Sequence, residues 1–180
     1  MQPSANDSLI KKLYPVILVG VVIFSAAVLL YFTNAYTAPI IEAQAVEGAK
    51  VQLKELFPEM TDVKMENDIY IVSTGGRTLG YAFTASGTGY GGTISIMVAL
   101  ENETTIKGIR IISQTETKGL GSRVELPTFT DRFTGQKIED IRLKSDGGQI
   151  DAITGSTVSS RAVINAVRET ALAKIQSLPK

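Results

Sequence analysis

The sequence contains no cysteine and no histidine. The absence of cysteine excludes disulfides, thiolate nucleophiles, iron–sulfur ligation, haem attachment through a Cys-x-x-Cys-His motif and a lipidated N-terminal cysteine as an anchor. The absence of histidine removes the usual zinc sites and any Ser-His-Asp triad. Any redox chemistry of this protein must therefore come from an organic cofactor.

An excess of charge of either sign is also absent, because 18 lysines and arginines balance 18 aspartates and glutamates. No basic face argues for DNA or RNA, so nucleic acid is not an expected partner. The length of 180 residues suits one domain with a core of fair size, together with additional segments.

Charge is missing altogether from Leu13 to Phe32, a run about as long as a helix that crosses a hydrocarbon core. We expect an uncleaved transmembrane helix over residues 13–36. Residues 1–12 should stay in the cytoplasm because Lys11 and Lys12 precede the run, which places the remaining chain outside the plasma (inner) membrane. A cleaved signal peptide is the alternative, but the apolar region of such a peptide is shorter, roughly 7 to 15 residues.

Residues 37–60 are expected to connect this anchor to the folded domain. From Pro39 to Phe57, apolar residues recur at helical spacing with charges of both signs on the other faces. The pattern predicts a helix that packs against the domain and ends at Pro58. The mixed charges argue against a basic amphipathic helix on a membrane surface. The apolar positions are Ile40, Ile41, Ala45, Ala49, Leu53 and Leu56.

Beyond Met60 the spacing of apolar residues changes to two, which predicts strands separated by hairpin connections. The expected strands are 69–72, 79–83, 93–100, 106–112 and 141–143. In the third strand Ile94, Ile96, Val98 and Leu100 share one face, which should be core. A short helix is expected over 127–133 and a long one over 158–175, with Val163, Ala166, Val167 and Ala171 buried. Residues 61–180 should therefore form an α+β domain with an antiparallel sheet and packed helices.

The start of the last predicted helix is rich in hydroxyl groups. Gly155 permits a backbone conformation that a β-carbon resists, and the neighbouring serines and threonines can cap the N–H groups of the first turn. Those N–H groups and the positive end of the helix dipole can also seat a phosphate. A helix with ordinary caps is the simpler interpretation of the same residues. A hydrolase using Ser156 or Ser159 with a lysine base is a further alternative, but no Ser-x-x-Lys motif lies near this turn.

The segment Asp151-x-x-Thr154-Gly155-Ser156-Thr157 resembles the flavinylation motif Asp-x-x-(Ser/Thr)-Gly-Ala-Thr. That motif belongs to the FMN-binding domains in the G subunit of Rnf complexes and in the C subunit of the sodium-pumping NADH:quinone reductase. The resemblance implies that Thr157 carries FMN covalently through a phosphoester bond. Ser156 stands where the family usually has alanine, and both residues are small enough for the turn.

Two other loops extend the resemblance. The segment 86–92, Ser-Gly-Thr-Gly-Tyr-Gly-Gly, reads by itself as a glycine-rich hairpin and lacks the Lys-Ser/Thr ending of a P-loop. It resembles the family's Gly-x-Gly loop, which implies that Gly89 and Gly91 approach the flavin and that Tyr90 contacts its ring. The segment 116–121, Glu-Thr-Lys-Gly-Leu-Gly, reads as an exposed turn and resembles the family's Glu-Thr-Pro-Gly-Leu-Gly loop. The flavin-binding residues implied there are Glu116, Thr117, Lys118, Gly119 and Leu120. Lys118 departs from the family's proline, and its cation near the ring would favour reduced anionic flavin.

The resemblance therefore implies an electron-transfer component of a membrane-bound Rnf-type ferredoxin:NAD oxidoreductase, coupled to sodium or proton translocation. It also implies other subunits of that complex as partners and a flavin transferase that uses flavin adenine dinucleotide as donor. The C subunit of the quinone reductase is the near alternative. A membrane-anchored sensor or regulator that responds to flavin redox state is the alternative from another class.

Overall fold

The computed structural model describes residues 5–178, and it describes the side chains of residues 14, 15, 18–33 and 46–178. The chain divides into two compact units, Met1–Ala45 and Val46–Lys180, which we describe separately.

The first helix, α1, spans Ala5–Leu56. It covers both of the helices expected from the sequence, and it ends two residues before Pro58, as the steric effect of proline predicts. Among the described residues, no helix has both the length and the apolar character needed to cross a bilayer. Several residues of the expected membrane and connecting segments lie outside the residues with described side chains. These are Lys11, Lys12, Leu13, Val16, Ile17, Tyr36, Ile40, Ile41 and Ala45.

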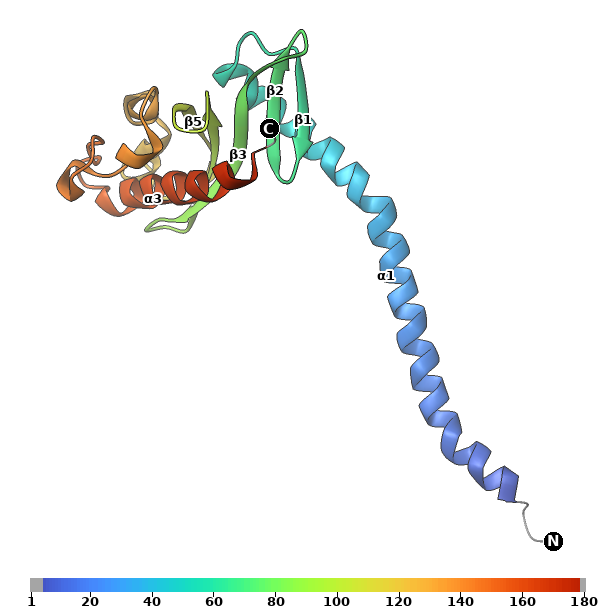
Figure 1. Ribbon diagram of the computed structural model, residues 1–180. Helices are drawn as coiled ribbons and strands as arrows, with labels where there is room; N and C mark the ends of the chain where they lie inside the picture. The colour runs from blue at the N-terminus through green and yellow to red at the C-terminus, as the bar shows by residue number, and fades with distance from the viewer. Residues whose placement is uncertain (1–4, 179–180) are drawn as a thin grey trace. The chain divides into compact units, whose positions relative to one another are not determined.

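The sheet of the second unit is a five-stranded antiparallel meander in the order β1-β2-β3-β4-β5 (Figure 1). The four main strands expected from the alternating pattern are confirmed. The additional strand, β1, has mostly charged residues, Asp-Val-Lys-Met-Glu, so it carries little apolar signal. The strands are β1 Asp62–Glu66, β2 Ile69–Thr74, β3 Arg77–Thr88, β4 Thr93–Leu100 and β5 Ile106–Gln114.

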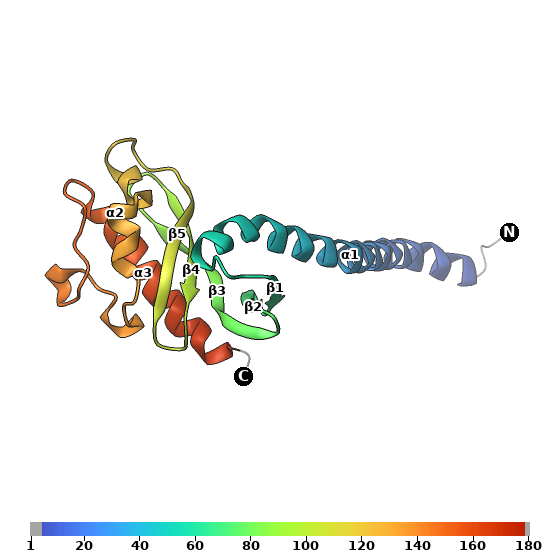
Figure 2. The ribbon, with the colours of Figure 1, turned by 90° about the horizontal axis from the view of Figure 1, so that it is seen from above.

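Both faces of the sheet are covered, and β4 contributes to both cores. Its residues Ile94, Ile96, Val98 and Leu100 are fully buried in the larger core. That core also contains the apolar residues of the last helix, α3 (Thr157–Lys174), which lies along the sheet in Figure 2. The predicted core face of this strand is therefore confirmed. Met97 and Ala99, which point the other way, are buried in a second core. That core contains residues at the end of α1 that were expected to pack on the domain, including Ala49, Leu53 and Leu56.

The segment between β5 and α3 consists of short helical turns. Helix α2, Pro127–Thr130, continues into a 3₁₀ turn at Asp131–Phe133, which confirms the short helix expected at 127–133. The strand expected at 141–143 is wrong, because only an isolated bridge between Leu143 and Ile150 forms there. Ile141 and Leu143 are buried and Arg142 is exposed. The alternation thus reflects anchoring of a loop in the core rather than strand pairing.

Helix α3 spans Thr157–Lys174 and continues into a 3₁₀ turn at Ile175–Ser177. It packs on β3 and β4 in the larger core. The four residues expected on its buried face, Val163, Ala166, Val167 and Ala171, are all buried. This packing places the N-terminus of α3 beside the loops that follow β3 and β5.

Candidate functional site

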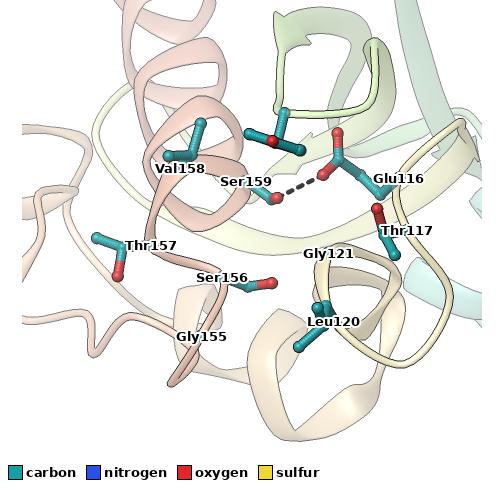
Figure 3. A pocket seen from close by; sticks show the side chains of 10 residues that line it. Glu116, Thr117, Leu120, Gly121, Gly155, Ser156, Thr157, Val158 and Ser159 are labelled. Atoms are coloured by element: carbon teal, nitrogen blue, oxygen red, sulfur yellow. Dashed lines mark hydrogen bonds between the residues drawn. The ribbon is translucent and has the colours of Figure 1, made fainter.

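A cleft of about 560 Å³ opens where three segments meet. The segments are the hairpin after β3, the loop after β5 and the first turn of α3 (Figure 3). Most of the accessible lining is apolar. The lining residues are Tyr90, Glu116, Thr117, Leu120, Gly121, Gly155, Ser156, Thr157, Val158 and Ser159.

The chain enters α3 through a turn that requires glycine. Gly155 has φ +81°, in the left-handed region that favours glycine, as the sequence predicted. The expected side-chain cap is wrong, because Ser156 at the N-cap position makes no capping hydrogen bond. Ser160 braces the turn instead: its hydroxyl accepts the N–H of Ile153 at 3.0 Å and donates to the carbonyl of Ser156 at 2.9 Å. The first-turn N–H groups therefore lack a side-chain cap and leave positive potential at the cleft.

Thr157 is the first residue of α3, and its side chain is exposed at the cleft. Figure 3 shows it on the opposite side of the helix start from Glu116. Two other residues of the predicted motif do not line the cleft. The Asp151 carboxylate pairs with Lys144 Nζ at 2.6 Å, while its carbonyl accepts a hydrogen bond from Arg132. Asp151 therefore supports the turn, and Thr154 is exposed outside the cleft.

An ion pair ties α3 to the loop before this turn. Arg161, in the second turn of α3, contacts the carboxylate of Asp146. The hydrogen bond from Arg161, assisted by one from Ser145, lowers the pKa of Asp146. The pair is exposed, so it contributes little to stability.

The glycine hairpin is shorter than the sequence suggested. Strand β3 continues to Thr88, so the turn comprises only residues 89–92, closed by a 2.8 Å hydrogen bond from Gly89 N–H to the Gly92 carbonyl. Gly87 lies in the strand, where a β-carbon would come within 2.6 Å of the Ala162 carbonyl of α3. Tyr90 projects from the turn with 81% of its surface exposed, and it lines the cleft.

The loop after β5 contains a buried carboxylate. Glu116 is only 7% exposed, so the expectation of a wholly exposed turn is wrong at this residue. Its Oε1 accepts the N–H of Gly91 at 2.9 Å, and its Oε2 accepts the hydroxyl of Ser159 at 2.5 Å. Gly89 and Gly121 approach this side chain so closely that a β-carbon on either would collide with it, and a β-carbon on Gly91 would collide with the backbone at Thr115 and Glu116.

Residues 117–120 form a tight turn. The N–H of Leu120 donates to the Thr117 carbonyl at 3.2 Å, and Gly119 has φ +77°. This geometry is typical of a type II turn, with Lys118 at the second position. Thr117 and Leu120 face the cleft, whereas exposed Lys118 and Gly119 do not line it.

The structure thus brings seven of the thirteen predicted site residues into the cleft lining. They are Tyr90, Glu116, Thr117, Leu120, Gly155, Ser156 and Thr157. The predicted residues that do not line it are Gly89, Gly91, Lys118, Gly119, Asp151 and Thr154. Gly121, Val158 and Ser159 line it but were not predicted to bind the cofactor; all three lie in or directly beside the recognised motifs. Ser159 was considered as a nucleophile, but its hydroxyl donates to Glu116, and no lysine lines the cleft.

Comparison with known proteins identifies the family to which this chain belongs. Residues 89–171 match the sequence profile of the FMN-binding domain, a range that includes all three cleft segments. The G subunit of the ion-translocating oxidoreductase complex of Methanosarcina acetivorans is 31% identical over 172 residues, covering 87% of this chain and 92% of that protein. The chain belongs to the family of G subunits of ion-translocating oxidoreductase complexes.

Other members of this G-subunit family show the same likeness. The G subunit of the ion-translocating oxidoreductase complex of Cronobacter sakazakii is 34% identical over 167 residues. The alignment covers 77% of this chain and 78% of that protein. Among solved structures, the C subunit of the Na⁺-translocating NADH-quinone reductase of Parabacteroides distasonis is 22% identical. That alignment covers 62% of this chain and 63% of the other, with a TM-score of 0.52. The two proteins therefore share a fold, and the sequence relatives favour the G-subunit family over the quinone-reductase alternative.

Proposed function

We propose that this G-subunit protein relays electrons through FMN held in the cleft, with the FMN phosphate esterified to the Thr157 hydroxyl. The observation that carries the proposal is the placement of Thr157, an exposed hydroxyl at an uncapped helix N-terminus beside an apolar cleft. Helix N-termini favour phosphate groups through their free N–H groups and dipole. The start of α3 is therefore a chemically suitable binding site for the phosphate of the cofactor.

The rest of the cleft suits the flavin ring. Its volume of about 560 Å³ lies within the range of small-molecule sites. Tyr90, Leu120 and Val158 supply exposed apolar surface that a planar ring would cover. Bound FMN supplies the electron transfer, while these side chains hold the ring and restrict water around it.

Attachment requires a flavin transferase with flavin adenine dinucleotide as donor. A bond forms between Thr157 Oγ1 and phosphorus, the bond between the two phosphates of the donor breaks, and adenosine monophosphate leaves with the hydroxyl proton passing to solvent. The ester joins the protein to the ribityl phosphate end, so it fixes the cofactor's position without altering the ring.

The proposed setting is a membrane complex that oxidises ferredoxin, reduces NAD and moves sodium ions or protons. Residues 1–12 would lie in the cytoplasm, 13–36 would cross the bilayer as one helix and 37–60 would connect to the FMN domain, 61–180, outside the cytoplasm. The apolar residues described between Leu18 and Phe32 have exposed side chains, which suits a lipid environment. Copurification of the chain with other subunits of such a complex would favour this relay over a sensor that works alone.

Mass spectrometry tests the attachment directly. The full chain is co-expressed with a flavin transferase, purified in detergent and digested with trypsin, which yields the peptide 145–161. We expect this peptide to gain the mass of FMN less one water, with fragmentation placing the addition on Thr157 rather than on Thr154, Ser156 or Ser159. An unmodified peptide from a host with active transferase would contradict the proposal.

Replacement of Lys118 by proline should change two properties of the protein. Proline pre-sets the backbone at the second position of the 117–120 turn, so we expect a gain of about 0.4–1 kcal/mol in unfolding free energy. Loss of the cation should lower the flavin midpoint potential, because a positive charge near the ring favours reduced anionic flavin. Denaturant unfolding and spectroelectrochemical titration measure these effects.

Lys118→Gln is the matched control, because it removes the charge without constraining the backbone. It should lower the potential equally and leave the unfolding free energy unchanged. An unchanged potential in both variants would show that this cation does not act on the flavin.

A further inference from the structure

Glu116 is the buried acidic side chain of the cleft, and its contacts join all three cleft segments. It extends from the loop after β5, accepts a hydrogen bond from Gly91 of the hairpin and accepts another from Ser159 of α3 (Figure 3). Ser159 is two residues from the proposed flavin acceptor, Thr157. One carboxylate therefore connects the hairpin, its own loop and the first turn of the helix that presents Thr157.

The glycines around Glu116 show that this junction is closely packed. A β-carbon on Gly89 would lie 2.9 Å from Glu116 Cδ, and one on Gly91 would lie 3.0 Å from Glu116 Cα. One on Gly121 would lie 2.8 Å from Glu116 Cβ. These separations are shorter than ordinary carbon–carbon contacts of about 3.5–4.0 Å. Gly89 and Gly121 thus leave room for the Glu116 side chain, and Gly91 lets the hairpin approach the backbone of the loop after β5.

Within the described part of the chain, no ion pair includes Glu116. Its two polar partners are a backbone amide and a hydroxyl, both of which donate, as a carboxylate acceptor requires. A negative charge with these neutral partners acts strongly on nearby charges, because burial reduces screening by solvent.

We infer that Glu116 is the positioning residue of the flavin cleft and that its charge lowers the reduction potential of the flavin held there. The inference rests on the proposed function. By joining Gly91 to Ser159, the carboxylate fixes the distance between the glycine hairpin and the start of α3, and so sets the cleft into which Thr157 presents its hydroxyl. Addition of an electron places negative charge on the flavin, which the carboxylate disfavours.

Two substitutions separate the positioning effect from the charge effect. Glu116→Gln keeps an oxygen acceptor for Gly91 and offers an amide donor to the Ser159 oxygen, so flavin content should equal that of the parent. Its oxidised–reduced equilibrium should shift about tenfold or more toward reduced flavin, which is about 59 mV for a one-electron couple. Glu116→Ala removes both acceptors and leaves space, so covalent flavin content should fall severalfold.

The measurements use the full chain, co-expressed with a flavin transferase, with Glu125→Gln as the surface control. Glu125 is exposed, does not line the cleft and lies outside the 117–120 turn whose Thr117 and Leu120 line it, so the same change of charge there should leave the potential nearly unchanged. The charge effect is overturned if Glu116→Gln and Glu125→Gln have equal potentials. The positioning effect is overturned if Glu116→Ala carries as much flavin as the parent.

A parent chain without covalent flavin would contradict the proposed linkage and leave Glu116 open to a separate test. Oxidised and reduced FMN are then titrated into the unmodified parent and Glu116→Gln proteins. We expect the variant to favour reduced FMN by the same tenfold or larger ratio. An equal ratio in the two proteins, or no FMN binding by either, would overturn the role of Glu116.

Discussion

Thr157→Ala should yield a folded protein with no covalent flavin, even in a host with active flavin transferase. The change removes the proposed acceptor oxygen from an exposed position at the start of α3, and it leaves the brace between Ser160, Ile153 and Ser156 intact. The measurement is flavin fluorescence of the denatured protein band, which reports covalently attached cofactor alone. The expected result is complete loss of the signal.

The neighbouring hydroxyls are less suitable acceptors for identifiable reasons. Ser159 donates to Glu116 and Ser160 donates to the Ser156 carbonyl, so both are engaged. Ser156 is 5% exposed, whereas the Thr157 side chain is exposed at the cleft. The Thr157 hydroxyl is therefore more accessible to a flavin transferase than the hydroxyls of Ser156, Ser159 and Ser160.

Two matched variants make the Thr157 result specific. Thr157→Ser keeps a hydroxyl on the same backbone position and should retain covalent flavin. Thr154→Ala removes an exposed threonine from the same motif but outside the cleft, and should also retain it. Fluorescence that persists in Thr157→Ala would place the linkage on another residue, and Ser156→Ala would be the next variant to measure.

The fold was largely predictable because the sheet has a simple pattern. The four main strands are rich in β-branched and aromatic residues, and short connections make them antiparallel neighbours. Strand β1 was missed because its sequence, Asp-Val-Lys-Met-Glu, offers one buried side chain. Residues 141–143 show the opposite failure, because Ile141 and Leu143 alternate with Arg142 for reasons of loop anchoring. The spacing of apolar residues indicates which side chains are buried. It does not indicate which other segment, if any, pairs with a strand through backbone hydrogen bonds.

The predicted site depended on motif resemblance more than on local physics. The resemblance selected residues near the cleft, but it could not distinguish those that line the cleft from those that support it. Asp151 pairs with Lys144, and Gly91 donates to Glu116, so both serve the structure around the cleft. The burial of Glu116 could not be predicted from the sequence either, because its hydrogen-bond partners Gly91 and Ser159 are 25 and 43 residues away along the chain. Such contacts appear only when the three segments are brought together.

Gly121→Ala should be the most damaging single-carbon change in the cleft. The added Cβ would lie 2.8 Å from Glu116 Cβ and 2.9 Å from Ser159 Oγ. These neighbours are buried, so the loop after β5 must move away from α3. We expect a loss of about 1–3 kcal/mol in unfolding free energy and a severalfold fall in covalent flavin. Denaturant unfolding of the unflavinylated full chain and in-gel fluorescence of the co-expressed protein measure the two effects.

Gly119→Ala separates stability from cleft geometry. Gly119 has φ +77° with open space around its Cβ position, so alanine there is strained by roughly 1–2 kcal/mol without a collision. It should therefore lose comparable stability but keep its flavin. Equal flavin content in Gly121→Ala and Gly119→Ala would show that close packing at Gly121 is not required. In the double variant Gly121→Ala/Glu116→Ala, the losses should be less than additive, because truncation of Glu116 removes the carboxylate oxygen that the new methyl group meets, while the contacts with Cβ of residue 116 and Ser159 Oγ remain.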